Sequence, residues 1–183
     1  SLLHDETHAI EVAVARHGTV IAEFAHGPDT TGQHLAPNAP FRLASISKVF
    51  ASVVVLQLVE EGLLQLDQPF AQQWAGSLSV SDPRVRQITV RQLLQHTSGF
   101  GKFRDMFFKN GSTAWHDSAD QALAATLDHD PGTFYSYSNA NYVVLGRLVE
   151  QITGQPYEQA VAARVFTPLG ITTARFNVHT ADI

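Results

Sequence analysis

The chain has no cysteine among its 183 residues. Without thiols it can form no disulfide framework and cannot use a thiolate as a nucleophile. Positive charge is also scarce: 12 lysines and arginines against 17 aspartates and glutamates give a formal net charge of −5. Proteins that bind nucleic acid usually carry a basic patch or stripe, so the composition argues against that class.

Long hydrophobic runs are missing as well. The longest purely aliphatic run, Val53 to Leu56, is far too short for a transmembrane segment. No signal peptide is visible at Ser1, but a processed chain would not show one, so this leaves the compartment open. The composition, 44% hydrophobic and 16% charged, is that of a globular protein, and the length allows a real hydrophobic core.

The hydrophobic pattern predicts a hairpin followed by helices. Apolar residues alternate over 11–24 on both sides of His17-Gly18, which is typical of a β-hairpin. The pattern is helical from 45 to 61 and stops at Gly62. Because this helix is apolar nearly all round, we expect it to be buried. An amphipathic helix then follows "SYSN" and ends at Gly154.

Local signals mark further helix ends. Thr89 with Gln92 and Ser118 with Gln121 have the spacing of a capping box. Pro156 is expected to open a helix, which closes before Pro168.

This order of elements predicts an α+β fold, an antiparallel sheet with flanking helices plus a mostly helical part. We divide the chain into 1–43, which holds the hairpin, and 44–183, which is mostly helical. A two-stranded sheet is marginal alone, and "TTARFNVH", 172–179, is the best candidate for another strand. We therefore expect that residues outside this sequence, or a second chain, complete the sheet; the alternative is an unusual fold.

A serine and a lysine stand three residues apart in "FRLASISKVF". At the start of a helix, Ser45 and Lys48 share one face, so an amine lies within reach of a hydroxyl. Serine needs a partner that takes its proton, and a desolvated lysine can do so. The apolar neighbours Ile46, Val49 and Phe50 are expected to supply the desolvation. The alternative is that the spacing arises by chance and that the Lys48 amine simply extends to water.

A second candidate group lies in "YSYSN", just before a helix. In the simplest interpretation Ser138 or Asn139 is an N-cap and Tyr137 is a half-buried aromatic. Alternatively, the phenol relays protons and the Asn139 amide holds a substrate amide.

Three segments in this order and at this spacing resemble the serine β-lactamase and penicillin-binding protein family. They are "FRLASISKVFASVVVLQLVEEGLLQLDQPF", "ITVRQLLQHTSGF" and "PGTFYSYSNANYVVLGRLVEQITG". The likeness is strongest to class C β-lactamases, Streptomyces-type D-Ala-D-Ala carboxypeptidases and related esterases, and it covers almost the whole chain from the hairpin onward.

The resemblance implies a role for each candidate residue. Ser45 corresponds to the acylated serine, with its backbone N–H as one of two oxyanion donors, and Lys48 corresponds to the proton acceptor. Tyr137 corresponds to the proton shuttle, and Asn139 to the residue that contacts the lysine and the substrate amide. The family needs no metal and no organic cofactor, so none is expected here.

One family motif is missing. The resemblance leads us to expect Lys/His-Thr-Gly on a strand lining the cleft, where it supplies the second oxyanion donor. Ile152-Thr153-Gly154 ends a helix and lacks the cation, and His17-Gly18-Thr19 has the wrong order. Family members run to about twice this length, so the resemblance implies an N-terminal portion.

The remaining patterns are interpreted as structural. His96-Thr97-Ser98-Gly99 matches a recurrent family segment and is interpreted as a helix end whose histidine caps carbonyls. His4 and His8 have zinc-helix spacing but no general-base Glu and no third ligand, so no metal site is expected. Asn110-Gly111-Ser112 fits the glycosylation pattern, but a turn is expected there instead. Core packing rather than a cleft wall is expected for five aromatic residues: Phe100, Phe103, Phe107, Phe108 and Trp115.

The sequence therefore predicts a serine acyl-transfer enzyme that forms an acyl-enzyme on Ser45. The expected substrates are D-Ala-D-Ala peptides of peptidoglycan or β-lactams. An esterase on the same scaffold and a non-catalytic fragment or binding module stay as alternatives. The resemblance favours a bacterial protein that is secreted or periplasmic, with the cytoplasm as the alternative.

Overall fold

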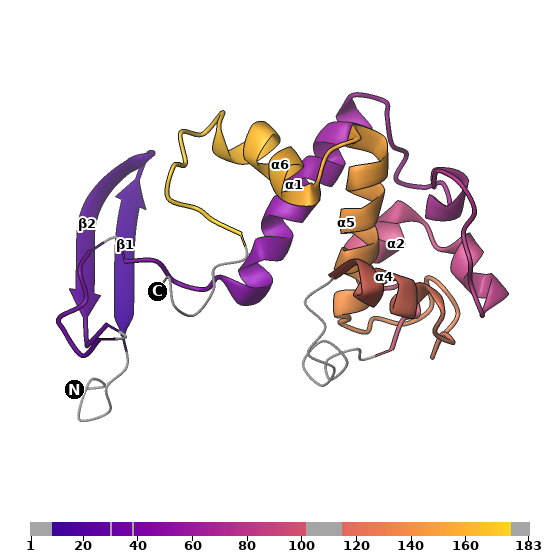
Figure 1. Cartoon of the computed structure of the whole chain (residues 1–183), viewed down its shortest axis with the longest axis horizontal. Helices are drawn as coiled ribbons and strands as arrows, with labels where there is room; N and C mark the ends of the chain where they lie inside the picture. The colour runs from indigo at the N-terminus through magenta and orange to yellow at the C-terminus, as the bar shows by residue number, and fades with distance from the viewer. Residues whose placement is uncertain (1–8, 30, 38, 102–114, 177–183) are drawn as a thin grey trace. The chain divides into compact units, whose positions relative to one another are not determined.

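The computed structural model describes residues 9–29, 31–37, 39–101 and 115–176 (Figure 1). The chain forms two compact units, Ser1–Leu43 with Thr173–Ile183, and Ala44–Thr172.

The first unit contains the predicted hairpin. Strands β1 (Ile10–Arg16) and β2 (Thr19–His26) pair antiparallel with Val12 opposite Phe24. They are joined at His17-Gly18, where both residues have positive φ (50° and 78°), as a tight hairpin turn requires. The described part of the other expected strand, 172–176, is not a strand, and 177–179 lie outside the described residues. Within the described residues the sheet thus has two strands.

The second unit is helical. Its helices are α1 (Ser47–Glu60), α2 (Val90–Leu94), α4 (Trp115–Leu123), α5 (Asn139–Thr153) and α6 (Tyr157–Val161), which continues into a π-helical turn, Ala162–Phe166. Three short 3₁₀ turns lie at Ala44–Ile46, Phe70–Gln72 and Pro83–Gln87. Helix α5 contacts α1, α2, α4 and α6, so it is the central element of the core.

Capping explains where two of these helices begin. Thr89 and Gln92 form the predicted capping box of α2, since each side chain bonds the backbone N–H of the other (3.2 and 2.9 Å). Ser138 caps α5, which ends at Gly154 in the left-handed conformation. Pro156 is the N-cap of α6, and the π-helical turn ends at Phe166, before Pro168, as expected.

The capping box predicted at Ser118 is wrong. Helix α4 already includes Trp115, so Ser118 lies inside the helix. The Trp115 ring stands 6.0 Å from the ring of Tyr157, and Gly146 leaves room for it on α5. This tertiary contact holds the first turn in helical conformation, which the local sequence signal does not reveal.

The prediction that α1 is buried all round is correct for one side only. Ala51, Val54, Val55 and Leu58 are buried against the neighbouring helices. A second apolar stripe, which begins at the residue before α1 and continues along the helix, is exposed: Ile46, Val49, Val53 and Leu56. The described residues therefore cover about half of an apolar helix.

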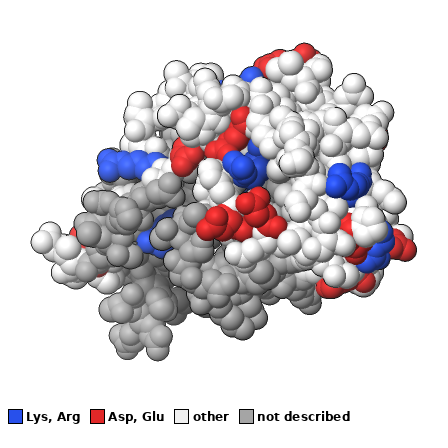
Figure 2. Space-filling view, turned by 45° about the vertical axis from the view of Figure 1, so that its right-hand side comes forward, with Lys and Arg blue, Asp and Glu red and all other residues white. Residues whose placement is uncertain are grey.

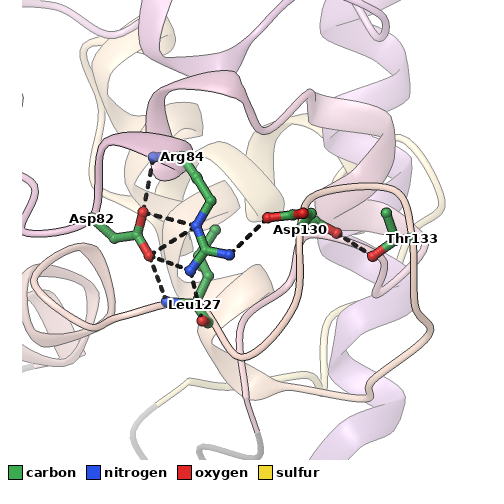
Figure 3. A network of polar contacts seen from close by, with 5 residues as sticks. All are labelled: Asp82, Arg84, Leu127, Asp130 and Thr133. Carbon is green, nitrogen blue, oxygen red and sulfur yellow. Dashed lines mark hydrogen bonds and ion pairs between the residues drawn. The ribbon is translucent and has the colours of Figure 1, made fainter.

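A polar network fixes the loop that leads to Tyr137 (Figure 3). The buried Asp82 carboxylate accepts hydrogen bonds from the Arg84 guanidinium (2.6 Å) and from the Leu127 backbone N–H (3.0 Å). Arg84 also donates to Asp130 (2.7 Å). The side-chain hydrogen bond from Arg84, followed by the Leu127 N–H, holds the pKa of Asp82 well below its usual range. The network thus ties the Pro83–Gln87 turn to the loop 127–133.

Surface charge is mixed. On the face shown in Figure 2, the described Lys and Arg side chains lie beside Asp and Glu side chains without forming an extended basic patch. In the part of the chain that the structure describes, no helix has the length and apolar character needed to cross a membrane.

Candidate active site

The structure brings the four predicted site residues together within the second unit. Lys48 Nζ lies 3.0 Å from Ser45 Oγ and donates to Asn139 Oδ1 at 2.8 Å. The Tyr137 hydroxyl donates to Ser45 Oγ at 2.8 Å. The Ser45 hydroxyl therefore contacts an amine and a phenol, the two groups that could move its proton.

Two helix N-termini hold these groups in place. Ser45 lies in the 3₁₀ turn Ala44–Ile46, which leads directly into α1, and Lys48 is in the first turn of α1. Asn139 is the first residue of α5, and Tyr137 immediately precedes the Ser138 cap. The start of α1, with the turn that carries Ser45, thus meets the start of the central helix.

The expected source of desolvation for Lys48 is wrong for two of the three neighbours, since Ile46 and Val49 are 62% and 58% exposed. The third, Phe50, is half-buried and packs edge-on against the ring of Phe166. Two tyrosine rings flank the half-buried amine instead, with Nζ 5.0 Å from the ring centroid of Tyr137 and 5.6 Å from that of Tyr142. The Lys48 amine is thus enclosed by groups from α5 and the segment that precedes it.

The residue before Ser45 has an unusual backbone conformation. Ala44 has φ 45°, in the left-handed region that a residue with a Cβ rarely adopts. Its carbonyl oxygen accepts a hydrogen bond from Ser47 Oγ (2.6 Å). Strain of this kind is often found where a side chain must be presented in one orientation, and the sequence gives no sign of it.

The sequence interpretation of His96 needs correction. The segment does end α2 as predicted, but the His96 side chain does not cap carbonyl groups. It is buried, and its Nδ1 accepts a hydrogen bond from the backbone N–H of Ser138 (3.2 Å). Its ring packs against the rings of Tyr137 and Tyr142, with centroids 4.4 and 5.3 Å apart. Burial, and then the nearby charge of Lys48, lower the pKa of His96.

The other candidates take no part in this cluster. Phe100 is fully buried and Trp115 packs against Tyr157, as expected for core aromatics. Among the described residues, no group of three or more potential metal ligands gathers. Several earlier candidates lie outside the described residues: His4, His8, Phe103, Phe107, Phe108 and 110–112.

A model of the family described as Beta-lactamase matches residues 4–183. Penicillin-binding protein 4 of Amycolatopsis lactamdurans is 35% identical over 77% of this chain and 37% of its own length. Esterase EstB of Burkholderia gladioli is 34% identical over 89% of this chain and 45% of its own length. The chain thus spans less than half the length of these relatives.

Solved structures agree with the family match. The D-amino acid amidase from Ochrobactrum anthropi SV3, complexed with L-phenylalanine, superposes with a TM-score of 0.76 at 28% identity, over 88% of this chain and 47% of the amidase. EstCE1, a hydrolase with promiscuous acyltransferase activity, has a TM-score of 0.73 at 29% identity, over 87% of this chain and 46% of its own. These matches confirm the predicted α+β fold of the β-lactamase/transpeptidase type. The chain belongs to the beta-lactamase family.

Proposed function

We propose that this chain carries the nucleophilic half of a serine acyl hydrolase that works through an acyl-enzyme on Ser45. The observation that carries the proposal is the convergence of Lys48 Nζ and the Tyr137 hydroxyl on Ser45 Oγ, at 3.0 and 2.8 Å. A serine hydroxyl becomes a useful nucleophile when a neighbouring base can take its proton. The family match and the relatives named as penicillin-binding protein, esterase and amidase support the same class of reaction.

The proposed reaction has two halves. The Lys48 amine, in its uncharged form, accepts the Ser45 proton as Oγ attacks the substrate carbonyl carbon, and the backbone N–H of Ser45 donates to the oxyanion. Tyr137 passes its proton to the leaving group as the bond of that group to the carbonyl carbon breaks, and the proton that Lys48 took from Ser45 replaces it on the phenol. Water then attacks the acyl-enzyme, gives one proton back through the same groups, and releases the acid and free Ser45.

The proposed substrates are D-Ala-D-Ala peptides or β-lactams, with Asn139 binding the substrate amide through its side-chain nitrogen. Its Oδ1 already orients Lys48, which fixes the plane of the amide. Peptidoglycan peptides lie outside the cytoplasmic membrane, so this substrate would place the protein in a secreted or periplasmic location. The proposed chemistry uses side chains, a backbone N–H group and water.

An esterase is the second candidate, because EstB and EstCE1 are among the similar proteins. The two functions are separated by comparing the turnover of a nitrophenyl ester with that of a D-Ala-D-Ala peptide. Turnover of the ester alone would favour the esterase.

We further propose that residues outside these 183 complete the sheet and the cleft. The relatives are more than twice as long as the matched part, and five large apolar side chains of the hairpin are exposed: Val12, Val14, Val20, Ile21 and Phe24. Those residues would supply the second oxyanion donor, so the chain alone could be inert.

A fluorescent penicillin tests the proposed function in the full-length protein. We expect a covalent adduct at Ser45, located by peptide mass, and no adduct in Ser45→Ala. Lys48→Met, which keeps bulk but removes the amine, should lower the acylation rate by orders of magnitude. Labelling that persists in Ser45→Ala would refute the assignment.

A further inference from the structure

The segment that carries Tyr137 is held by His96 on both of its sides. The backbone N–H of Ser136 donates to the His96 carbonyl oxygen at 2.9 Å. The backbone N–H of Ser138 donates to His96 Nδ1 at 3.2 Å. One residue therefore accepts hydrogen bonds from the two neighbours of Tyr137, which fixes the backbone from which the phenol extends.

The ring of His96 fixes the phenol as well. It lies 4.4 Å from the Tyr137 ring, with 30° between the two planes, and 5.3 Å from the ring of Tyr142. Tyr142 in turn flanks the Lys48 amine. The imidazole thus packs against both of the tyrosine rings that flank the Lys48 amine.

The tautomer of His96 follows from its donors. A backbone N–H can only donate, so Ser138 requires an unprotonated Nδ1, and the Asn141 side-chain nitrogen lies 3.0 Å from the same atom. The neutral ring therefore carries its proton on Nε2. If Nδ1 were protonated, its N–H would face two other N–H donors, those of Ser138 and Asn141. The hydrogen bond from the Ser138 N–H would then be lost.

We propose that His96 is a positioning residue for the acyl-transfer site, whose neutral imidazole and carbonyl oxygen hold Tyr137 so that its hydroxyl stays on Ser45 Oγ. The inference rests on the proposed function, because its purpose is the proton transfer at Ser45. His96 does not contact Ser45 or the reacting atoms and acts only through Tyr137 and its neighbours.

Two variants separate the acceptor from the ring. His96→Asn keeps an acceptor on the same branch of the side chain and tolerates the positive φ of 58°, but it loses the ring. His96→Phe keeps a ring and leaves the Ser138 N–H and the Asn141 amide without their acceptor. We expect His96→Phe to lower the acylation rate constant about 10- to 100-fold, with little change in the binding constant for the penicillin. His96→Asn should recover a large part of this loss.

His129→Phe is the matched control, because the His129 ring contacts Phe134 and no described group of the site. The acylation rate of this variant should be unchanged.

A double-mutant cycle with Tyr137→Phe tests whether His96 acts through the phenol. If it does, His96→Phe should cost little further rate once the phenol hydroxyl is gone, so the two losses are not additive. A purely structural role would lower the thermal midpoint equally in both backgrounds and leave the losses additive. Additive losses, or wild-type acylation by folded His96→Phe, would overturn the inference.

A measurement on the unmodified protein keeps the test decisive if His96→Phe does not fold. Nitrogen-15 NMR of the imidazole at pH 7.5 should show Nδ1 unprotonated and Nε2 protonated, and a proton on Nδ1 would overturn the inference. Failure of the proposed function is recognised separately, since then Ser45→Ala retains acylation or the wild-type protein has none.

Discussion

At the scale of single residues, the site depends on a hydroxyl pair that joins two distant parts of the chain. Tyr137 donates to Ser45 Oγ at 2.8 Å across 92 positions of sequence. We expect Tyr137→Phe to lower the acylation rate about 10²- to 10⁴-fold, because the proton relay to the leaving group is lost. The thermal midpoint should hardly change, since the ring contact with His96 is kept. Tyr135→Phe is the control: Tyr135 lies two residues before Tyr137, its side chain is 62% exposed, and loss of its hydroxyl should not change the acylation rate. Equal effects of the two changes would contradict the relay.

His96 also makes stability depend on pH. Its pKa in the folded protein is lowered from 6.5 by burial and by the charge of Lys48, and the rings of Tyr135, Tyr137 and Tyr142 face it. The unfolded chain therefore binds a proton at a pH where the folded one does not. The stabilising contribution is fully present above pH 6.5 and is lost as the pH falls from there through the folded pKa.

Urea unfolding at pH 8, 6.5 and 5 measures this contribution. As the pH is lowered, the free energy of unfolding should decrease less in His96→Asn than in the wild-type protein. The variant lacks the imidazole, and the other titrating groups are common to both proteins. The same pH dependence in both proteins would show that His96 is not the group responsible.

The sequence predicted the local pair of the candidate site, and the family resemblance named its two distant members, Tyr137 and Asn139; the structure brings the four side chains together. Ser45 and Lys48 are three apart, so helical geometry alone brings them together. The role of His96 depends on backbone hydrogen bonds to Ser136 and Ser138, forty residues later, which no spacing reveals. The left-handed backbone conformation of Ala44 could not be predicted either, because alanine gives no local signal for it.

At the scale of elements, residues 96–99 bind the loop that leads to Tyr137 through backbone hydrogen bonds. The carbonyl oxygens of Thr97 and Gly99 accept hydrogen bonds from the backbone N–H groups of Gly132 (2.7 Å) and Asp128 (2.9 Å). The approach is so close that a Cβ on Gly99 would overlap the His129 carbonyl oxygen, at a φ of 91°. Glycine is therefore required there by space as well as by backbone conformation.

Gly99→Ala should destabilise the protein by roughly 3 kcal/mol or more and lower acylation, because backbone must shift. Gly154→Ala is the matched control: its φ is 67° but nothing lies within 4 Å of the added Cβ. That change should cost only about 1 kcal/mol, the penalty for the left-handed conformation itself. Chemical denaturation measures the free energy of unfolding of both variants. Equal losses would mean that Gly99 is not tightly packed against the loop.

The Asp82 network holds the far end of the same loop (Figure 3). Asp82→Ala should destabilise the protein clearly, because it removes the acceptor of the buried Leu127 N–H and the carboxylate that pairs with the Arg84 guanidinium. Asp67→Ala provides the comparison, since Asp67 pairs with Arg91 while 74% exposed. We expect little change there, as for most surface ion pairs. The measurement is the denaturant midpoint, and a larger shift for Asp67→Ala would contradict this account.

Elements with their own start and stop signals were predicted well, and those defined by contacts were not. Helix α5 has Ser138 as its cap and Gly154 as its stop, both readable in sequence. Helix α4 begins earlier than Ser118 because Trp115 packs against Tyr157, a contact visible only in the folded chain.

At the scale of the whole molecule, the uncovered side of α1 is the main departure from an ordinary core. The exposed stripe Ile46, Val49, Val53 and Leu56 follows the spacing i, i+3, i+7, i+10, which places it along one face of the helix. Single exposed apolar residues are normal, whereas contiguous exposed apolar surface is typical of interaction sites and of surfaces that other parts of a protein cover. The sequence predicted that this side is buried, and the length of the relatives suggests what buries it.

Substitutions on the two faces of α1 test whether further residues cover the stripe. In the 183-residue chain, Val53→Ser with Leu56→Ser should reduce binding of an apolar dye and change stability by only about 0.5 kcal/mol each, because both side chains are exposed (38% and 48%). Val54→Ser on the buried face should cost about 2–4 kcal/mol in the same chain.

In the full-length protein the two faces should behave alike. If further residues pack on the stripe, Val53→Ser loses its exposed character and becomes destabilising to an extent that approaches Val54→Ser. Urea midpoints of Val53→Ser and Val54→Ser in both chain lengths, each compared with the wild-type protein of the same length, give the comparison directly. A Val53→Ser change that stays neutral in the longer protein would mean that the stripe remains open to solvent. Completion of the fold over α1 would then have to be abandoned, although the chemistry proposed at Ser45 would stand.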